Sequence, residues 1–223
     1  MHLLHILLPV FGVFIPALLL PGPDFIGVVR SAMTRGALGG LKTTAGVTLG
    51  QGVYATLSIL GLSTVMLHYE WLTWVVRVAG GAYLIYLGVR LVFAGPGAAR
   101  PAEVRQGDVP GDVPGDMQPD VQGSAFLFGF FVTLTNPKAV VLFASIFATA
   151  VTADTPAWVM ALMIALVMAS AATWYAIVSV FMASPPVMRR FAHARHVIER
   201  VAGVCFVAVG LRILADARNP VTP

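Results

Sequence analysis

Long apolar runs separated by short polar turns dominate this chain. A helix needs about 20 apolar residues to cross the hydrocarbon core of a bilayer. Six stretches reach or approach that length, at residues 3–29, 38–66, 72–93, 124–151, 158–183 and 197–214. The pattern predicts an all-α integral membrane protein with six hydrophobic helical segments.

One hydrophilic linker divides these segments into two groups of three. Residues 95–123 contain the repeat GDVPGDVPGD, whose proline and glycine content predicts disorder. We therefore expect one three-helix repeat over 1–94, a second over 124–216, and a short tail over 217–223. Because three is odd, the two repeats must insert in opposite orientations, which makes them inverted.

A repeated sequence supports the division into halves. RVAGGAYLIYLGVRLVFA begins at Arg77, and RVAGVCFVAVGLRILADA begins at Arg200. Membrane proteins built from two related halves are typically transporters, because one half can rock against the other and alternate access to a central site.

Composition and charge agree with a membrane protein. The chain is 58% hydrophobic and 11% charged, whereas a soluble domain carries about 25% charged residues. Its net charge of +4 does not indicate nucleic-acid binding, since the basic residues form no face with interleaved aromatics. Most of them fall in alternate loops, which predicts that those loops face the cytoplasm and that both termini lie outside.

The first segment contains a predicted helix break at Pro21, Gly22 and Pro23, followed by Asp24. The prolines remove backbone donors and clash with the preceding turn. Broken backbone at membrane depth is tolerated only where it is buried in protein or lines a cavity. Alternatively, this sequence is an interfacial turn in which Asp24 caps a cytoplasmic amphipathic helix.

The fourth segment contains a second predicted break at Asn136 and Pro137, followed by Lys138. Lys138 is about 14 residues into the segment, or roughly 21 Å of helix, which places it near the bilayer midplane. A charge there costs at least about 2.5 kcal/mol. Lys138 should therefore face a wet cavity, contact an acid or be deprotonated, unless the break is only a kink with Lys138 reaching water along a groove.

The two breaks together suggest a site for a zwitterion. Lys138 and a helix N-terminus would hold a carboxylate, while Asp24 and free carbonyls near the first break would hold an ammonium group or exchange a proton. Gln51 and Tyr54 in the second segment either line the path or make only interhelical hydrogen bonds. We interpret Trp174 and Tyr175 as packing residues.

The second segment is rich in glycine, and Gly46 and Gly50 form a GxxxG spacing that lets two helices approach closely. We expect packing within the bundle, with a homodimer seam as the alternative. The sequence contains no cluster of histidine, cysteine and acidic residues that would predict a metal site. No candidate nucleophile has a suitable base and acid beside it, and no cofactor is expected. The sequence carries no enzyme signature.

The motifs resemble those of the LysE/RhtB family of bacterial amino-acid exporters. The matching sequences are PGPDF from Pro21, RGALGGLKTTAGVTLGQ from Arg35, GAYLIYLGVRL from Gly81 and LTNPKAVVLF from Leu134. The resemblance implies a multi-pass inner-membrane exporter of amino acids or their derivatives, driven by proton antiport. It also implies that Asp24, Asn136 and Lys138 matter for transport.

Two other functions remain open at this stage. One is a metal-ion exporter of the same wider superfamily, which a single membrane carboxylate and a nearby lysine disfavour. The other is a non-transporting scaffold that assembles through the glycine-rich second segment. The expected partners are therefore a small-molecule substrate and the lipid bilayer, with no nucleic acid.

Overall fold

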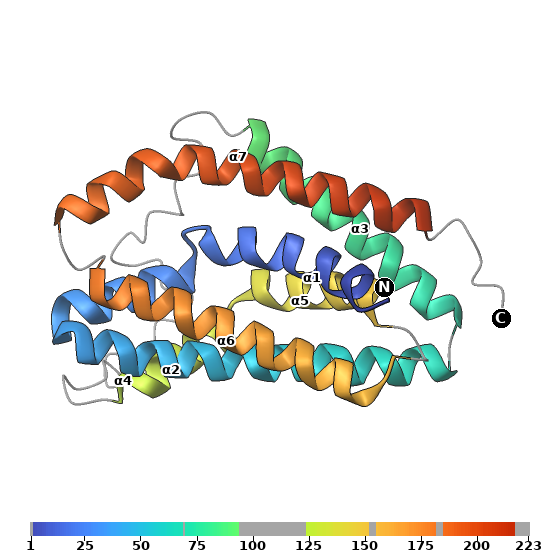
Figure 1. Cartoon of the computed structure of the whole chain (residues 1–223), viewed down its shortest axis with the longest axis horizontal. Coiled ribbons are helices and arrows are strands. Elements are labelled where there is room, and N and C mark those ends of the chain that lie inside the picture. Colours follow the sequence, from blue (N-terminus) through green and yellow to red (C-terminus); the bar gives the residue numbers. More distant parts are fainter. Residues whose placement is uncertain (1, 69, 94–123, 152–154, 182–184, 217–223) are drawn as a thin grey trace.

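The computed structural model describes residues 2–68, 70–93, 124–151, 155–181 and 185–216 (Figure 1). All regular secondary structure in these residues is helical, which confirms the predicted all-α fold. The predicted linker, 95–123, and the tail, 217–223, lie outside the described residues. The helices are α1 (His2–Leu19), α2 (Pro23–His68), α3 (Glu70–Phe93), α4 (Ala125–Leu134), α5 (Pro137–Ala150), α6 (Ala157–Phe181) and α7 (Pro185–Asp216).

Both proline motifs interrupt a helix, as the sequence predicted. α1 ends at Leu19 and α2 begins at Pro23, while α4 ends at Leu134 and α5 begins at Pro137. The pairs are bent by 44° and 65°, respectively. In each case a proline takes the first position of the new helix, where its missing N–H and fixed φ are no disadvantage.

The helix α2 is a hairpin of two helical parts joined at Gly36, which has φ 73° and ψ 177°. Glycine adopts this backbone conformation without the clash that a Cβ would cause. The two parts then pack against each other, since Ser31 lies beside Thr43 and Asp24 beside Gln51. Figure 1 shows the blue first part and the cyan second part running in opposite directions.

The described residues hold two to four candidate membrane spans by length and composition. Two single helices qualify, over Trp74–Phe93 and Ala157–Phe181, and each bent pair qualifies when it counts as one span. This is fewer than the six segments expected. The last expected segment, 197–214, lies in α7, where charged residues interrupt the apolar run. The six-segment arrangement therefore stays a prediction.

The two copies of the repeated sequence pack against each other. They lie in α3 and α7, which are in extensive contact. A Cβ on Gly88 would lie 2.6 Å from the Gly203 carbonyl oxygen, and one on Gly210 would lie 2.8 Å from the Gly81 carbonyl oxygen. Gly81 thus faces Gly210 and Gly88 faces Gly203, which makes the contact antiparallel and leaves no room for side chains.

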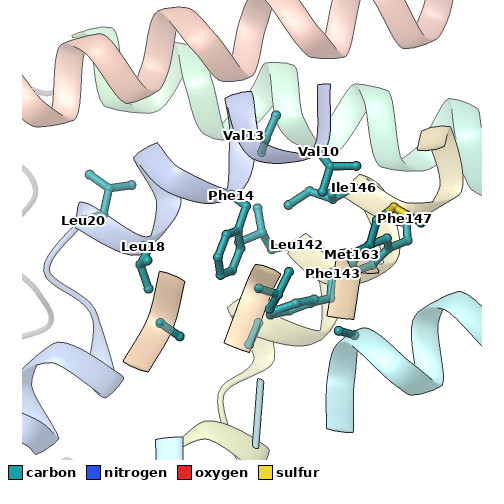
Figure 2. Close-up of a cluster of buried hydrophobic side chains, with 14 of the residues drawn as sticks. Val10, Val13, Phe14, Leu18, Leu20, Leu142, Phe143, Ile146, Phe147 and Met163 are labelled. Carbon is teal, nitrogen blue, oxygen red and sulfur yellow. The ribbon is translucent and has the colours of Figure 1, made fainter. Parts of the chain in front are cut away.

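Apolar side chains of α1 and α5 form the centre of the bundle (Figure 2). Phe14 of α1 meets Phe143 of α5 with ring centroids 5.8 Å apart, and Val10, Val13 and Met163 are almost fully buried around them. Large apolar side chains are also exposed on the outside of the bundle. A lipid environment accounts for that exposure, because hydrocarbon is the solvent of such a surface.

Candidate functional site

A small cavity lies where the two broken helices meet. Its volume is about 40 Å³, which is room for about three water molecules on the scale where one needs 10–15 Å³. The N-terminal turns of α2 and α5 both reach it. The lining residues are Phe14, Ala17, Leu18, Leu20, Gly22, Pro23, Asp24, Gln51, Asn136, Lys138, Ala139, Leu142, Phe143 and Tyr175.

The first break places a buried carboxylate in this cavity. Pro23 opens α2, and the Gly22 carbonyl accepts the first helical hydrogen bond, from the Ile26 N–H at 2.9 Å. Asp24 follows with only 7% of its surface exposed. Gln51 Nε2 donates to Asp24 Oδ2 at 3.2 Å. Since a helix N-terminus carries partial positive charge, it stabilises the ionised carboxylate there.

Two acceptor atoms of this pair remain without a hydrogen-bond partner. Asp24 Oδ1 and Gln51 Oε1 are both buried and accept no hydrogen bond. A buried acceptor without a donor costs about 1–3 kcal/mol. Both residues line the cavity, so a ligand with N–H donors could satisfy them.

At the second break, two hydrogen bonds from side chains replace the one backbone hydrogen bond that an uninterrupted helix would form. In an uninterrupted helix the Lys138 N–H would donate to the Leu134 carbonyl. Here the Lys138 N–H donates to Asn136 Oδ1 at 3.1 Å, and the Tyr54 hydroxyl donates to the Leu134 carbonyl at 2.7 Å. Asn136 thus caps α5, and Tyr54 of α2 provides a hydrogen-bond donor for the last carbonyl group of α4.

Lys138 brings a basic side chain to the same cavity. It occupies the second position of α5, where the helix dipole disfavours a cation. The charges of Asp24 and Glu199 act on it, but no Lys138–Asp24 ion pair within 4.0 Å forms. The Lys138 amino group and the α5 N-terminus therefore make a position that favours an anion.

The remaining wall of the cavity is apolar. Phe14 and Leu18 of α1 face Leu142 and Phe143 of α5, as Figure 2 shows. This wall excludes water from one side of the polar side chains that line the cavity, which strengthens the electrostatic interactions between them. The site has a polar end made by the two breaks and an apolar end made by α1 and α5.

The structure brings most of the predicted site residues together. Asp24, Gln51, Asn136 and Lys138 line one cavity, although they are far apart in the sequence. Tyr54 makes an interhelical hydrogen bond instead. Asp24 is buried and accepts a hydrogen bond from Gln51, which disfavours the alternative of an interfacial turn at the first break.

The remaining predicted residues lie next to the cavity or outside it. Pro21 and Pro137 belong to the breaks; Gly22 and Pro23 line the cavity, whereas Pro21 does not. Gly46 and Gly50 face α4, where a Cβ would meet the backbone of Phe126 or the side chain of Thr133. These two glycines therefore pack against another helix of the same chain.

Sequence reasoning missed three residues at or near the site. Tyr175 was interpreted as packing, yet it lines the cavity. Thr133 is fully buried beside Asp24. Glu199 is buried in α7 and accepts a hydrogen bond from Arg195 Nε at 2.6 Å. Glu199 could have been found, because it is an acid within the predicted segment 197–214.

A metal site has no ligands in the part of the chain that the structure describes. No three histidine, cysteine, aspartate or glutamate side chains come together there. The charged groups of the cavity are instead one carboxylate and one lysine. This pairing suits a ligand that carries both charges better than a divalent cation.

Comparisons with known proteins cover nearly the whole chain. The family model of the LysE type translocator matches residues 15–217. A threonine efflux protein of Escherichia coli (strain K12) is 28% identical over 215 residues, or 95% of this chain and 98% of that protein. A leucine efflux protein of Salmonella choleraesuis (strain SC-B67) is 30% identical over 132 residues, or 58% and 55%. No solved structure matches the chain significantly.

Proposed function

Because this chain belongs to the LysE type translocator family, we propose that it exports an amino acid, or an amino-acid derivative, across the bacterial inner membrane in exchange for protons. Members of a translocator family are transporters, not enzymes. The similar proteins are named for efflux of threonine and leucine, both of which are neutral amino acids.

The observation that carries the proposal is the meeting of two opposite charges at two helix N-termini in one cavity. Asp24 and Lys138 each occupy the second position of a helix that a proline opens. An amino acid has a carboxylate and an ammonium group on the same carbon, so it matches this pair. Its side chain would then lie against the apolar wall of α1 and α5.

The proposed binding mode assigns each group a partner. The Lys138 amino group and the partial positive charge of the α5 N-terminus hold the substrate carboxylate. Asp24 Oδ1 and Gln51 Oε1, the acceptors without donors, hold the ammonium group. When the substrate has left, Asp24 takes a proton from outside and carries it inward, which resets the transporter.

The cavity must open for this cycle, because it holds about three water molecules and an amino acid is several times larger. The structure therefore corresponds to a closed state of the proposed cycle. Alternating access requires opening first toward the cytoplasm, for loading, and then outward, for release.

We further propose that two inverted three-helix repeats produce these motions, over 1–94 and 124–216, with 95–123 as linker and 217–223 as tail. The antiparallel contact between the repeated sequences in α3 and α7 supports a local twofold relation. So does Figure 1, in which α3 and α7 run in opposite directions along the bundle. A homodimer remains a prediction without an assigned interface, since Gly46 and Gly50 already pack against α4.

Export from loaded vesicles tests the proposed function. Purified protein is reconstituted into liposomes that contain labelled threonine, leucine or lysine, and efflux is followed after a proton gradient is imposed. We expect faster efflux of a neutral amino acid than from protein-free liposomes, and loss of the stimulation with a protonophore. No efflux of any amino acid from liposomes that contain folded protein would contradict the proposal.

A further inference from the structure

A line of buried hydroxyl groups joins the cavity to the end of the bundle where α2 turns. It lies where the second part of α2 packs against its first part and against α6. Its members have at most 9% of their surface exposed, and they are Ser31, Thr43, Thr44, Thr48 and Ser179. We call this group the hydroxyl seam.

Hydrogen bonds connect the outer part of the seam. The Thr43 hydroxyl donates to Ser31 Oγ at 2.8 Å. Thr44 Oγ1 and Ser179 Oγ are 3.0 Å apart, and Ser179 Oγ donates to the Tyr175 carbonyl at 2.7 Å. Tyr175 itself lines the cavity, so the hydrogen bonds of the seam reach the site along α6.

The inner part of the seam follows one face of α2. Thr44, Thr48 and Gln51 are spaced four and three residues apart, so they lie in one row. The row is about 10 Å long at 1.5 Å per residue. It ends at Gln51, which donates to Asp24. The hydroxyls thus lead from the Gly36 turn to the proposed binding site.

Three neighbouring acceptors along this row have no hydrogen-bond partner. They are Thr48 Oγ1, Gln51 Oε1 and Asp24 Oδ1, and all three are buried. Each costs about 1–3 kcal/mol in the closed structure. Water entering between α2 and α6 would satisfy these atoms, which reduces the free energy needed to part the two helices.

The seam is closed in this structure by close packing of small residues. A Cβ on Gly40 would lie 2.8 Å from Ala32 Cβ and 2.9 Å from Ser179 Cβ. Arg30 and Arg35 are exposed near the turn that ends the seam. An apolar seam of the same shape would pack equally well without unpaired groups, so close packing alone does not account for the polar row.

We propose that the hydroxyl seam is the route by which water and substrate reach the cavity from the basic end of the bundle, opening when α6 separates from α2. The substrate class rests on the proposed function, but hydration of the seam does not. A groove of about 420 Å³ between α1 and α6 offers another approach, since Leu18 lines both the groove and the cavity. That groove is mainly apolar, which disfavours a zwitterion.

Cysteine accessibility tests the route. The only native cysteine, Cys205, is first replaced by Ser. Thr48→Cys and the neighbouring Leu49→Cys, whose native side chain is exposed on the outer face of α2, are then made in the reconstituted protein. We expect a water-soluble cationic methanethiosulfonate to react with Thr48→Cys at least tenfold faster than with Leu49→Cys, and saturating transported amino acid to slow that reaction.

Two substitutions at Thr48 separate the loss of the hydroxyl group from misfolding as the cause of slower export. Thr48→Val keeps the shape and removes the hydroxyl, whereas Thr48→Ser keeps the hydroxyl. We expect about fivefold slower export with Thr48→Val and near-normal export with Thr48→Ser. Equal labelling of the two cysteine variants, together with normal export by Thr48→Val, would overturn the route. Rapid labelling of Thr48→Cys without efflux of any amino acid would support the route and refute the proposed substrate class.

Discussion

The two helix breaks share one local design but differ in the sign of the charge that follows the proline. At the first break Asp24 is the second residue of α2, and at the second break Lys138 is the second residue of α5. A helix N-terminus stabilises the aspartate and destabilises the lysine. The helix dipole thus favours the charge at the first break and disfavours the charge at the second.

This difference indicates where a ligand contributes most. Gln51 and the α2 N-terminus already stabilise Asp24. Lys138 is attracted by Asp24 and Glu199 without an ion pair to Asp24. An incoming carboxylate would give Lys138 a direct counter-ion. This difference supports the second break as the anion-binding half of the proposed site.

The breaks also differ in how firmly the chain before them is held. α4 lies against α2, where Gly46 allows the Phe126 backbone to approach and Gly50 faces Thr133. α1 makes fewer contacts with its neighbours, and a Cβ on Gly12 would meet nothing within 4 Å. The second break is thus clamped by close backbone contact, whereas α1 is held by the packing of its apolar side chains.

The largest expected effect comes from removing the charge at the second break. Lys138→Ala deletes the proposed partner of the substrate carboxylate, and loss of one member of a buried charged contact costs about 2–5 kcal/mol. We expect export to fall at least thirtyfold in the liposome assay. Lys42→Ala, at an exposed position of α2, is the matched control and should export normally. Full export by Lys138→Ala would show that the positive charge is not part of the site.

The first break should respond differently to loss of its charge. Asp24→Asn keeps the size of the side chain but cannot ionise. We expect export driven by a proton gradient to fall about tenfold. Exchange of labelled for unlabelled amino acid should fall less, because the Asn oxygen can still accept from the ammonium group. Glu199→Gln, which neutralises the other buried acid near Lys138, should keep its response to a protonophore. If Asp24→Asn remained as sensitive to the protonophore as the wild type, the proton would travel through another group.

The clamp on the second break is tested by adding a methyl group. Gly46→Ala places a Cβ against the Phe126 carbonyl, and such overpacking costs about 1–3 kcal/mol. In a chain of this size that corresponds to a fall in Tm of about 2–12 °C. Gly12→Ala in α1 has open space and gains helix propensity, so its Tm should stay the same or rise. Equal Tm values for the two variants would mean that α4 is free to shift.

The smallest effect concerns the hydrogen bond that closes the end of α4. Tyr54→Phe leaves the Leu134 carbonyl without its donor, which costs about 1 kcal/mol, or about 2–4 °C in Tm. Tyr83→Phe on α3 is the control and should change Tm less. A fall in Tm for Tyr54→Phe but not for Tyr83→Phe would show that the Tyr54–Leu134 hydrogen bond stabilises the break. An unchanged Tm would mean that Asn136 alone stabilises it.

Local rules were sufficient to predict the helix breaks. Proline at the first helical position and asparagine before it act through the backbone of the same few residues, so Pro23, Asn136 and Pro137 could be interpreted from the sequence. The partners of these breaks could not. Tyr54 is 80 residues from Leu134, and Gln51 is 27 residues from Asp24, so their pairing depends on how α2 folds back.

The sequence by itself determined that this chain is helical, that it needs lipid as a solvent, and that its helices break beside Asp24 and Lys138. These features follow from apolar length and from proline chemistry, which are properties of neighbouring residues. Only the tertiary structure decided that both breaks open onto one cavity, that Tyr175 and Thr133 adjoin it, and that the repeated glycines of α3 and α7 face each other. Such contacts depend on the directions in which whole helices pack, and no short stretch of sequence specifies those directions.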